Sequence, residues 1–322
     1  MNFLLTVFWI IILLTVVLLH VAYATYAERK IIGHMQVRLG PMHVGWHGLL
    51  QPIADGVKCF FKEDVIPANA DRKVFIAAPI ISLTAMLTSF AVVPFAKGWV
   101  LCDISIGLLF LFAMSGLAGY GTVLAGWSSN SKYSFLGGLR STAQVISYEV
   151  AMGLSLVGVM LLAGSLNLTE IVEAQGNSFW GMYLFPQCVG FFVFLVAMFA
   201  ETNRVPFDMP ECESELVSGY ATEYSGMRYA LFFMAEYIGM FVMSSLGTIC
   251  FLGGWYGPFE VPHFPAFWFV LKVYLFIFLF IWVRSTIPRY RYDQLMGLGW
   301  KLLIPLALAN IVFTAFLKAI LG

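Results

Sequence analysis

The chain has 322 residues, of which 60% are hydrophobic and only 11% are charged, and its mean hydropathy is strongly positive. This length would give two soluble domains, but the composition excludes that class. The formal net charge is zero, and we expect no nucleic-acid partner. Because the apolar runs approach about 20 residues, rather than the about 10 of a barrel strand, we expect an all-α polytopic membrane protein with one domain over residues 1–322.

Eight apolar runs are long enough to cross a hydrocarbon core of roughly 30 Å as helices. The first run contains Ala22-Tyr23-Ala24, which resembles a signal-peptide cleavage site. No Lys or Arg precedes this run, however, and it is too long for a signal core, so we expect a first transmembrane helix. The predicted spans are 3–24, 74–95, 104–127, 143–165, 180–200, 229–252, 266–284 and 300–320.

The basic residues between these spans predict the orientation of the chain. Two connections, 166–179 and 253–265, contain no Lys or Arg, so the positive-inside rule assigns them to the outer side together with both termini. If the protein is bacterial, this side is the periplasmic side of the cell inner membrane. The cytoplasmic connections, taken with the adjoining helix ends, hold every Lys and Arg except Lys97, Lys272 and Lys318; they are 25–73, 128–142, 201–228 and 285–299.

The long first connection contains a segment, GWHGLLQPIADGVKCFFKED, with helical periodicity. Its apolar residues follow a spacing of three and four, which predicts an amphipathic helix lying in the membrane interface. We expect Pro52 in its first turn or at a kink. A surface helix that only anchors the loop is the alternative. The predicted apolar stripe comprises Trp46, Leu49, Leu50, Ile53, Val57, Phe60 and Phe61.

Three ionisable residues interrupt the predicted spans: Glu149, Glu236 and Lys272. A charge at such depth costs roughly 2.5–3.5 kcal/mol, so it normally faces protein or water and marks a route for ions or protons. The alternatives are side chains that reach the interface from near a helix end, or a structural Lys–Glu pair between helices. Three such residues in one chain favour a proton or ion route.

The connection AETNRVPFDMPECESELVSGYATEYSG, residues 200–226, gathers six carboxylates against one cation, Arg204. A solvated surface is the simpler interpretation of such a loop. Two prolines and a phenylalanine in RVPFDMPE, however, indicate a packed segment, and it lies beside the spans that carry Glu149 and Glu236. The carboxylates are Glu201, Asp208, Glu211, Glu213, Glu215 and Glu223.

The five cysteines are scattered, and none has the C-x-x-C or Cys/His spacing of a zinc or iron–sulfur site. We therefore expect this chain to hold no metal centre of its own.

Five motifs together resemble the H-type membrane subunits of bacterial respiratory complex I, the NADH-quinone oxidoreductases, whose mitochondrial counterpart is NADH–ubiquinone oxidoreductase chain 1. The resemblance extends from the first helix to the last, with the motifs in the same order. They are AYATYAERKIIGHMQVRLGP, GLLQPIADGVKCFFKED, SYEVAMGLSL, AETNRVPFDMPECESELVSGYATEYSGMRYALFFMAEY and RSTIPRYRYDQLMGLGWK.

The resemblance implies the role of a proton-translocating enzyme subunit without a redox centre. Members of that family form much of the quinone chamber where the membrane arm meets the hydrophilic arm. Electrons come from an iron–sulfur cluster in a neighbouring subunit, and antiporter-like membrane subunits are further partners. The resemblance therefore implies quinone, either ubiquinone or menaquinone, as substrate, and no flavin or iron–sulfur cluster bound by this chain alone.

The family's functional residues fall on matching positions of this sequence. The resemblance implies that Asp55 and Lys272 are coupled to an acidic route that leads from the chamber into the membrane. That route comprises Glu149, Glu201, Glu211, Glu213, Glu223 and Glu236. Residues around the chamber and its interface with the hydrophilic arm comprise Glu28, Arg29, Arg38, Arg284, Arg289 and Arg291.

One departure concerns GPMHVGW, where family members commonly have G-P-N-R-x-G-P, so His43 replaces a permanent cation. We expect an exposed histidine there, with a pH-sensitive role as the alternative. Three other functions stay open from the sequence: the homologous membrane component of an energy-converting hydrogenase, which binds no quinone, a free-standing transporter, and a scaffold. The absence of an internal repeat argues against the transporter.

Overall fold

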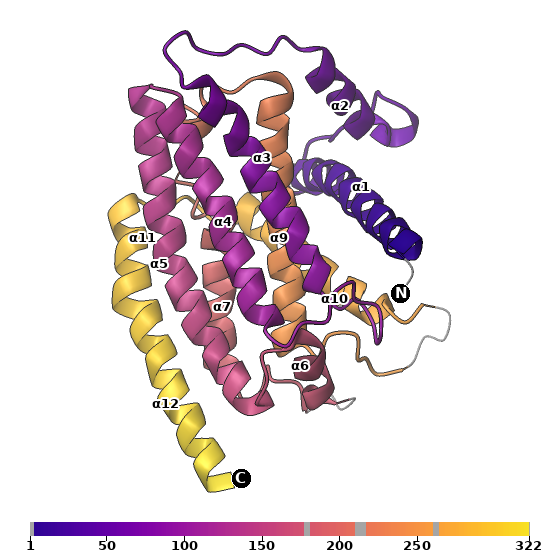
Figure 1. The fold of residues 1–322 in the computed structure, drawn as a ribbon, viewed down its shortest axis with the longest axis vertical. Coiled ribbons are helices and arrows are strands. Elements are labelled where there is room, and N and C mark those ends of the chain that lie inside the picture. The colour runs from indigo at the N-terminus through magenta and orange to yellow at the C-terminus, as the bar shows by residue number, and fades with distance from the viewer. Residues whose placement is uncertain (1–2, 177–180, 210–216, 260–263, 322) are drawn as a thin grey trace.

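The computed structural model describes residues 3–176, 181–209, 217–259 and 264–321. Long helices dominate these residues and form a bundle in which α3, α4, α5, α9 and α12 run in similar directions, while α1 is inclined to them (Figure 1). The elements are α1 (Phe3–Met35), η1 (Trp46–Gly48), α2 (Gln51–Phe61), α3 (Arg72–Ser89), η2 (Phe90–Val92), α4 (Gly107–Ser128), α5 (Lys132–Ala163), α6 (Leu168–Gln175), α7 (Cys188–Glu201), η4 (Gly219–Ala221), α9 (Gly226–Phe251), α10 (Phe267–Thr286), α11 (Tyr292–Leu298), the π-helical η5 (Gly299–Leu303) and α12 (Ile304–Leu321).

Seven of the described helices are long and apolar enough to cross a membrane, so the predicted all-α membrane class is confirmed. The fifth predicted span, 180–200, is the exception: among its described residues the α-helix is confined to α7, whose 14 residues are about 21 Å long. Pro186 explains the late start, because within a helix it would remove a hydrogen bond and clash with the preceding turn. The chain from 181 to 187 instead forms turns and joins α7 at its N-cap, Gln187.

Two helices continue well beyond their predicted spans. α1 extends to Met35 and α5 begins at Lys132, because Lys, Arg and Glu, which end an apolar run, are still good helix formers. The sequence also did not predict α6, which begins where the side chain of Asn167 accepts a hydrogen bond from Thr169 N at 2.8 Å.

The central helix of the bundle is α9. In its most apolar stretch of 18 residues, 72% is buried inside the protein, against 17% in the corresponding stretch of α1. Its residues therefore face other helices on nearly all sides. A polar side chain on α9, such as that of Glu236, is consequently surrounded by protein rather than lipid.

Small residues allow α3, α4 and α5 to approach closely, as expected for membrane helices. Ser82 Oγ of α3 donates to Ala118 O of α4 at 2.9 Å, and a Cβ on Gly121 would lie 2.0 Å from Ser82 Oγ. On α5, a Cβ on Gly137 would lie 2.6 Å from Gly219 Cα. Not every glycine in the spans has this role, because Gly153 faces open space.

The predicted amphipathic helix of the first connection is confirmed as α2, with Pro52 in its first turn. It begins later than the apolar stripe, because His47 and Gly48, both within η1, have left-handed φ values of 52° and 83° that interrupt a continuous helix before α2. Its side chains of Ile53, Phe60 and Phe61 are 60%, 71% and 87% exposed. Such a face fits the predicted place at a membrane interface. Figure 1 shows α2 at the end of the bundle opposite α6.

We predict that Gly137→Ala destabilises the protein, because the added methyl group meets backbone atoms of Gly219 and Tyr220 that cannot rotate away. Overpacking of this kind costs about 1–3 kcal/mol. Thermal unfolding of the purified protein in detergent measures the effect. Gly153→Ala on the same helix is the control, since its methyl group meets nothing within 4 Å. Equal unfolding temperatures for the two variants would contradict the predicted contact.

Candidate functional site

A cluster of buried charges lies where α1, α9, α10 and the segment after α7 meet. Its centre is Arg204, only 4% exposed, which is placed between Glu28 of α1 and Glu236 of α9. Arg284 of α10 pairs with the same oxygen of Glu28, and Tyr237 Oη donates to the other oxygen at 2.5 Å. Four segments far apart in the sequence thus share one group of charges.

The backbone around Arg204 is held by hydrogen bonds from both sides. Arg204 N donates to Phe199 O at 3.2 Å, so the chain turns back immediately after α7. From α5, Gln144 Nε2 donates to Ala200 O at 2.8 Å and to Phe207 O at 2.7 Å. The guanidinium therefore projects from a fixed segment and not from a free loop.

The contacts of Arg204 combine directed bonds with Coulombic attraction. Its Nη1 donates to Glu28 Oε1 at 3.3 Å. Its Nε lies 2.7 Å from Glu236 Oε1, but the N–H is not aimed at that oxygen, so this pair is held mainly by charge. The guanidinium carbon also lies 4.4 Å from the centre of the Tyr237 ring, a cation–π distance.

Arg204 remains charged in this buried position. Burial alone lowers the pKa of Arg204, but the attraction of Glu236 and Glu28 outweighs it and raises that pKa above its ordinary value. The side chain is thus a permanent positive charge between two carboxylates.

On one side of the cluster an open hollow of about 410 Å³ lies between α1, α9 and α10. We call it the charged pocket. It brings together four of the six residues predicted around the quinone chamber. The lining residues are Glu28, Arg29, Ile32, Gln36, Arg38, Phe233, Tyr237, Arg284 and Ser285.

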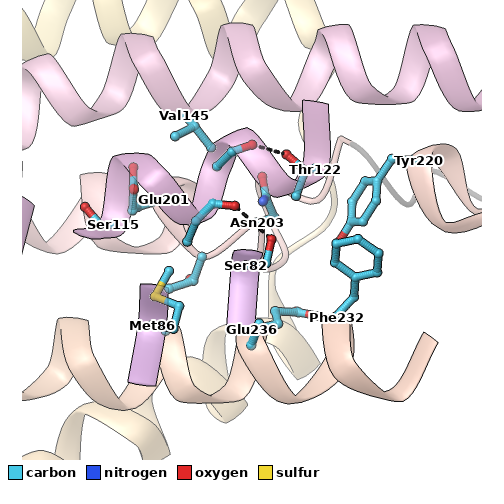
Figure 2. A pocket seen from close by; sticks show the side chains of 15 residues that line it. Ser82, Met86, Ser115, Thr122, Val145, Glu201, Asn203, Tyr220, Phe232 and Glu236 are labelled. Carbon is cyan, nitrogen blue, oxygen red and sulfur yellow. Dashed lines mark hydrogen bonds between the residues drawn. The ribbon is translucent and has the colours of Figure 1, made fainter. Parts of the chain in front are cut away.

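On the other side lies a smaller hollow of about 60 Å³, the carboxylate cavity. Figure 2 shows its labelled side chains arriving from α3, α4, α5, η4 and α9, and from the end of α7 and the segment that follows it. Glu201 and Glu236, two of the predicted acidic residues, both line it. The other lining residues are Ser82, Met86, Ser115, Ala118, Gly119, Thr122, Val145, Thr202, Asn203, Tyr220, Phe232, Ala235 and Gly239.

Glu149 lies next to this cavity and completes a group of three carboxylates. Its Oε1 would be 3.1 Å from a Cβ on Gly116, so the missing side chain of that glycine makes room for the carboxylate. Glu149 and Glu201 are close enough to repel each other. In the described part of the chain, Glu201 Oε2 is buried and has no hydrogen-bond partner.

Two residues predicted to couple with the acidic route lie outside both hollows. Asp55 pairs with Arg29 at 2.6 Å and links α2 to α1 near the charged pocket. Lys272, on the first turns of α10, donates to three backbone carbonyls that follow α9, those of Leu252, Gly254 and Tyr256. In this position it stabilises the C-terminal end of α9. Its partners are thus carbonyl groups, in contrast to the Lys–Glu pair considered from the sequence.

Three further predicted residues, Arg289, Arg291 and Glu223, also lie apart from the two hollows. Arg289 pairs with Asp208 at 2.9 Å, and Arg291 pairs with the exposed Asp293 at 2.6 Å. Glu223 is half-buried near η4. Glu211 and Glu213, together with Glu215, lie outside the described residues. His43 is exposed, as expected.

The sequence did not predict the roles of Arg204, Tyr237 and Gln144. Arg204 carried a signal, since it is the single cation of an acidic connection, but its partners are distant in sequence. Gln144 and Tyr237 gave no indication of their partners, because these partners are also distant in sequence.

The chain matches a family model described as NADH dehydrogenase over residues 8–315. It is 57% identical to the H subunit of NADH-quinone oxidoreductase from Rhodospirillum rubrum, with 92% of this chain and 88% of that protein covered. It is 53% identical to the H subunit numbered 2 of the same enzyme from Geobacter metallireducens, covering 97% and 94%. For the H subunit of Rickettsia typhi the identity is 55%, covering 92% and 89%.

We predict that Gln144→Leu destabilises the fold, because it leaves the buried carbonyls of Ala200 and Phe207 without this donor. Both carbonyls keep a backbone donor, Asn203 N and Met209 N, so each lost bond to Gln144 contributes about 0.5–1.5 kcal/mol. Tyr148→Phe is the matched variant on the same helix, since it removes one hydrogen bond, from Tyr148 Oη to Leu295 O. Thermal unfolding should rank Gln144→Leu as the more destabilised. The reverse order would contradict the role given to Gln144.

Proposed function

Because this chain belongs to the NADH dehydrogenase family, whose members compared above are H subunits of NADH-quinone oxidoreductases, we propose that its charged pocket binds quinone and that its carboxylate cavity carries protons. The chain is a multi-pass membrane subunit of that multi-subunit enzyme complex. The observation that carries the proposal is the position of Arg204, whose two carboxylate partners line the pocket and the cavity respectively.

The lining of the charged pocket fits a quinone head group. Quinone oxygens accept hydrogen bonds, and Arg284, Arg38 and Tyr237 supply donors. Ile32 and Phe233 give the same hollow an apolar wall for the ring and the first part of the tail. Reduction of the quinone consumes two electrons, delivered from an iron–sulfur cluster of a neighbouring subunit, and two protons.

The carboxylate cavity fits a proton route in size and composition. One buried water needs about 10–15 Å³, so a hollow of about 60 Å³ holds a few waters. These waters would satisfy Glu201 Oε2 and join it to Glu236 across the cavity. Carboxylates at such depth in a membrane protein mark ion or proton pathways. Protons would then pass on toward antiporter-like partner subunits.

The arrangement also supports the proposed orientation. The charged pocket, α2 and the arginine-rich connections belong to the same end of the bundle, which we assign to the cytoplasmic side by the positive-inside rule. The exposed apolar face of α2 would then rest in that interface, and both termini would lie on the periplasmic side of a bacterial inner membrane.

We predict that Arg284→Gln raises the KM for quinone about tenfold, because it removes a charged donor worth about 1.5–3 kcal/mol and leaves Glu28 with one cation fewer. NADH-dependent quinone reduction by the assembled complex, measured over a range of quinone concentrations, gives this value. Arg72→Gln, exposed at the start of α3, is the control. An unchanged KM in Arg284→Gln would contradict the proposal that the charged pocket binds quinone.

We predict that Glu236→Gln at least halves the number of protons translocated per electron, because an amide cannot exchange protons in the cavity. Proton uptake by proteoliposomes during NADH oxidation measures this ratio. Glu170→Gln, an exposed carboxylate of α6, should leave the ratio unchanged. A normal reduction rate with full proton pumping in Glu236→Gln would contradict the proposed route.

A further inference from the structure

One side chain, Arg204, contacts a lining residue of each of two hollows with different properties. The charged pocket and the carboxylate cavity share no lining residue, although both involve α9. Glu28 lines only the pocket, and Glu236 lines only the cavity. Arg204 contacts both carboxylates and belongs to neither lining.

The two carboxylates compete for the same guanidinium. Nη1 of Arg204 lies 3.3 Å from Glu28 and Nε lies 2.7 Å from Glu236. All three side chains are largely buried, with exposed side-chain fractions of 5%, 6% and 17% for Arg204, Glu28 and Glu236. Because water hardly screens these charges, neutralising one carboxylate strengthens the hold of Arg204 on the other.

The partners on the pocket side make Glu28 responsive to what the pocket holds. Glu28 also pairs with Arg284 and accepts a hydrogen bond from Tyr237, and both of these residues line the pocket. A ligand that engages Arg284 or Tyr237 weakens their contacts with Glu28. The attraction between Glu28 and Arg204 therefore changes. This change reaches Glu236 through Arg204, whose backbone is fixed by its bond to Phe199 O.

We propose that Arg204 is the positioning residue through which the charge state of the pocket sets that of the cavity. The inference rests on the proposed function of both hollows. When Glu28 is neutralised, Arg204 is drawn to Glu236 and holds it ionised. When a ligand draws Arg284 or Tyr237 away from Glu28, that carboxylate attracts Arg204 more strongly, and Glu236 can take up a proton. Since the linkage is reciprocal, a change at Glu236 also alters the pocket.

The test is a pair of crossed measurements on the assembled complex in proteoliposomes. Glu28→Gln changes the pocket wall, and we expect it to lower the protons translocated per electron about twofold, although Glu28 does not line the cavity. Glu236→Gln changes the cavity wall, and we expect it to alter the KM for quinone about twofold, although Glu236 does not line the pocket. In the double variant each effect should be smaller than the sum of the single effects, because the two residues act through one arginine.

Asp64→Asn is the control, because it removes a carboxylate from another partly buried ion pair, with Arg228 at 3.1 Å, away from both hollows. It should change neither readout. Arg204→Lys retains the charge but has one small ammonium in place of a guanidinium that contacts both carboxylates. In this background, Glu28→Gln should no longer change the proton ratio, and Glu236→Gln should no longer change the KM for quinone. If that variant does not assemble, the two glutamine variants decide the question by themselves.

Two different failures can be told apart. If Glu28→Gln raises the KM for quinone but leaves the proton ratio unchanged, and Glu236→Gln leaves the KM unchanged, the link through Arg204 is overturned while the proposed function stands. If Glu28→Gln changes neither the KM nor the rate of quinone reduction, the charged pocket itself is not the quinone site, and both proposals fail.

Discussion

The charged guanidinium of Arg204, buried among helices, is the constraint on which the rest of the site depends. The buried charge of Arg204 is compensated by carboxylates, and removal of one partner of such a pair typically costs about 3–5 kcal/mol. The compensation here comes from Glu28 of α1 and Glu236 of α9, so those helices cannot move apart without exposing an unpaired charge. Gln144 of α5 adds a third attachment by holding the segment that carries the arginine.

This arrangement explains why polar groups can lie so deep in an apolar bundle. The central helix α9 is covered by its neighbours, so Glu236 is surrounded by protein and lines the carboxylate cavity. A glycine makes room for another carboxylate, since Gly116 has no side chain in the space that the carboxylate of Glu149 occupies. Lys272 follows a different principle, because carbonyl groups at the end of α9 surround its ammonium. It therefore contributes to the fold at a distance from the three carboxylates.

Much of the fold could be predicted from the sequence, because lipid requires long apolar helices with their own hydrogen bonds. The fifth span was wrong in extent, since hydropathy does not register that Pro186 delays the helix. The site was harder to predict. Depth in the membrane singled out Glu149 and Glu236, but the pairing of Arg204 with Glu28 joins residues 176 positions apart, which no local pattern reveals. The family resemblance supplied the charged residues, and the structure places six of them in the linings of the two hollows, four in the charged pocket and two in the carboxylate cavity.

The central claim is that events in the charged pocket change the protonation of a carboxylate in the cavity. The most direct measurement is an infrared difference spectrum of the assembled complex, recorded between oxidised and reduced quinone, in the region where protonated carboxyl groups absorb. We predict a carboxyl band that changes with quinone reduction and is missing in Glu236→Gln. A spectrum without such a band, or one with the same band in wild type and variant, would contradict the account.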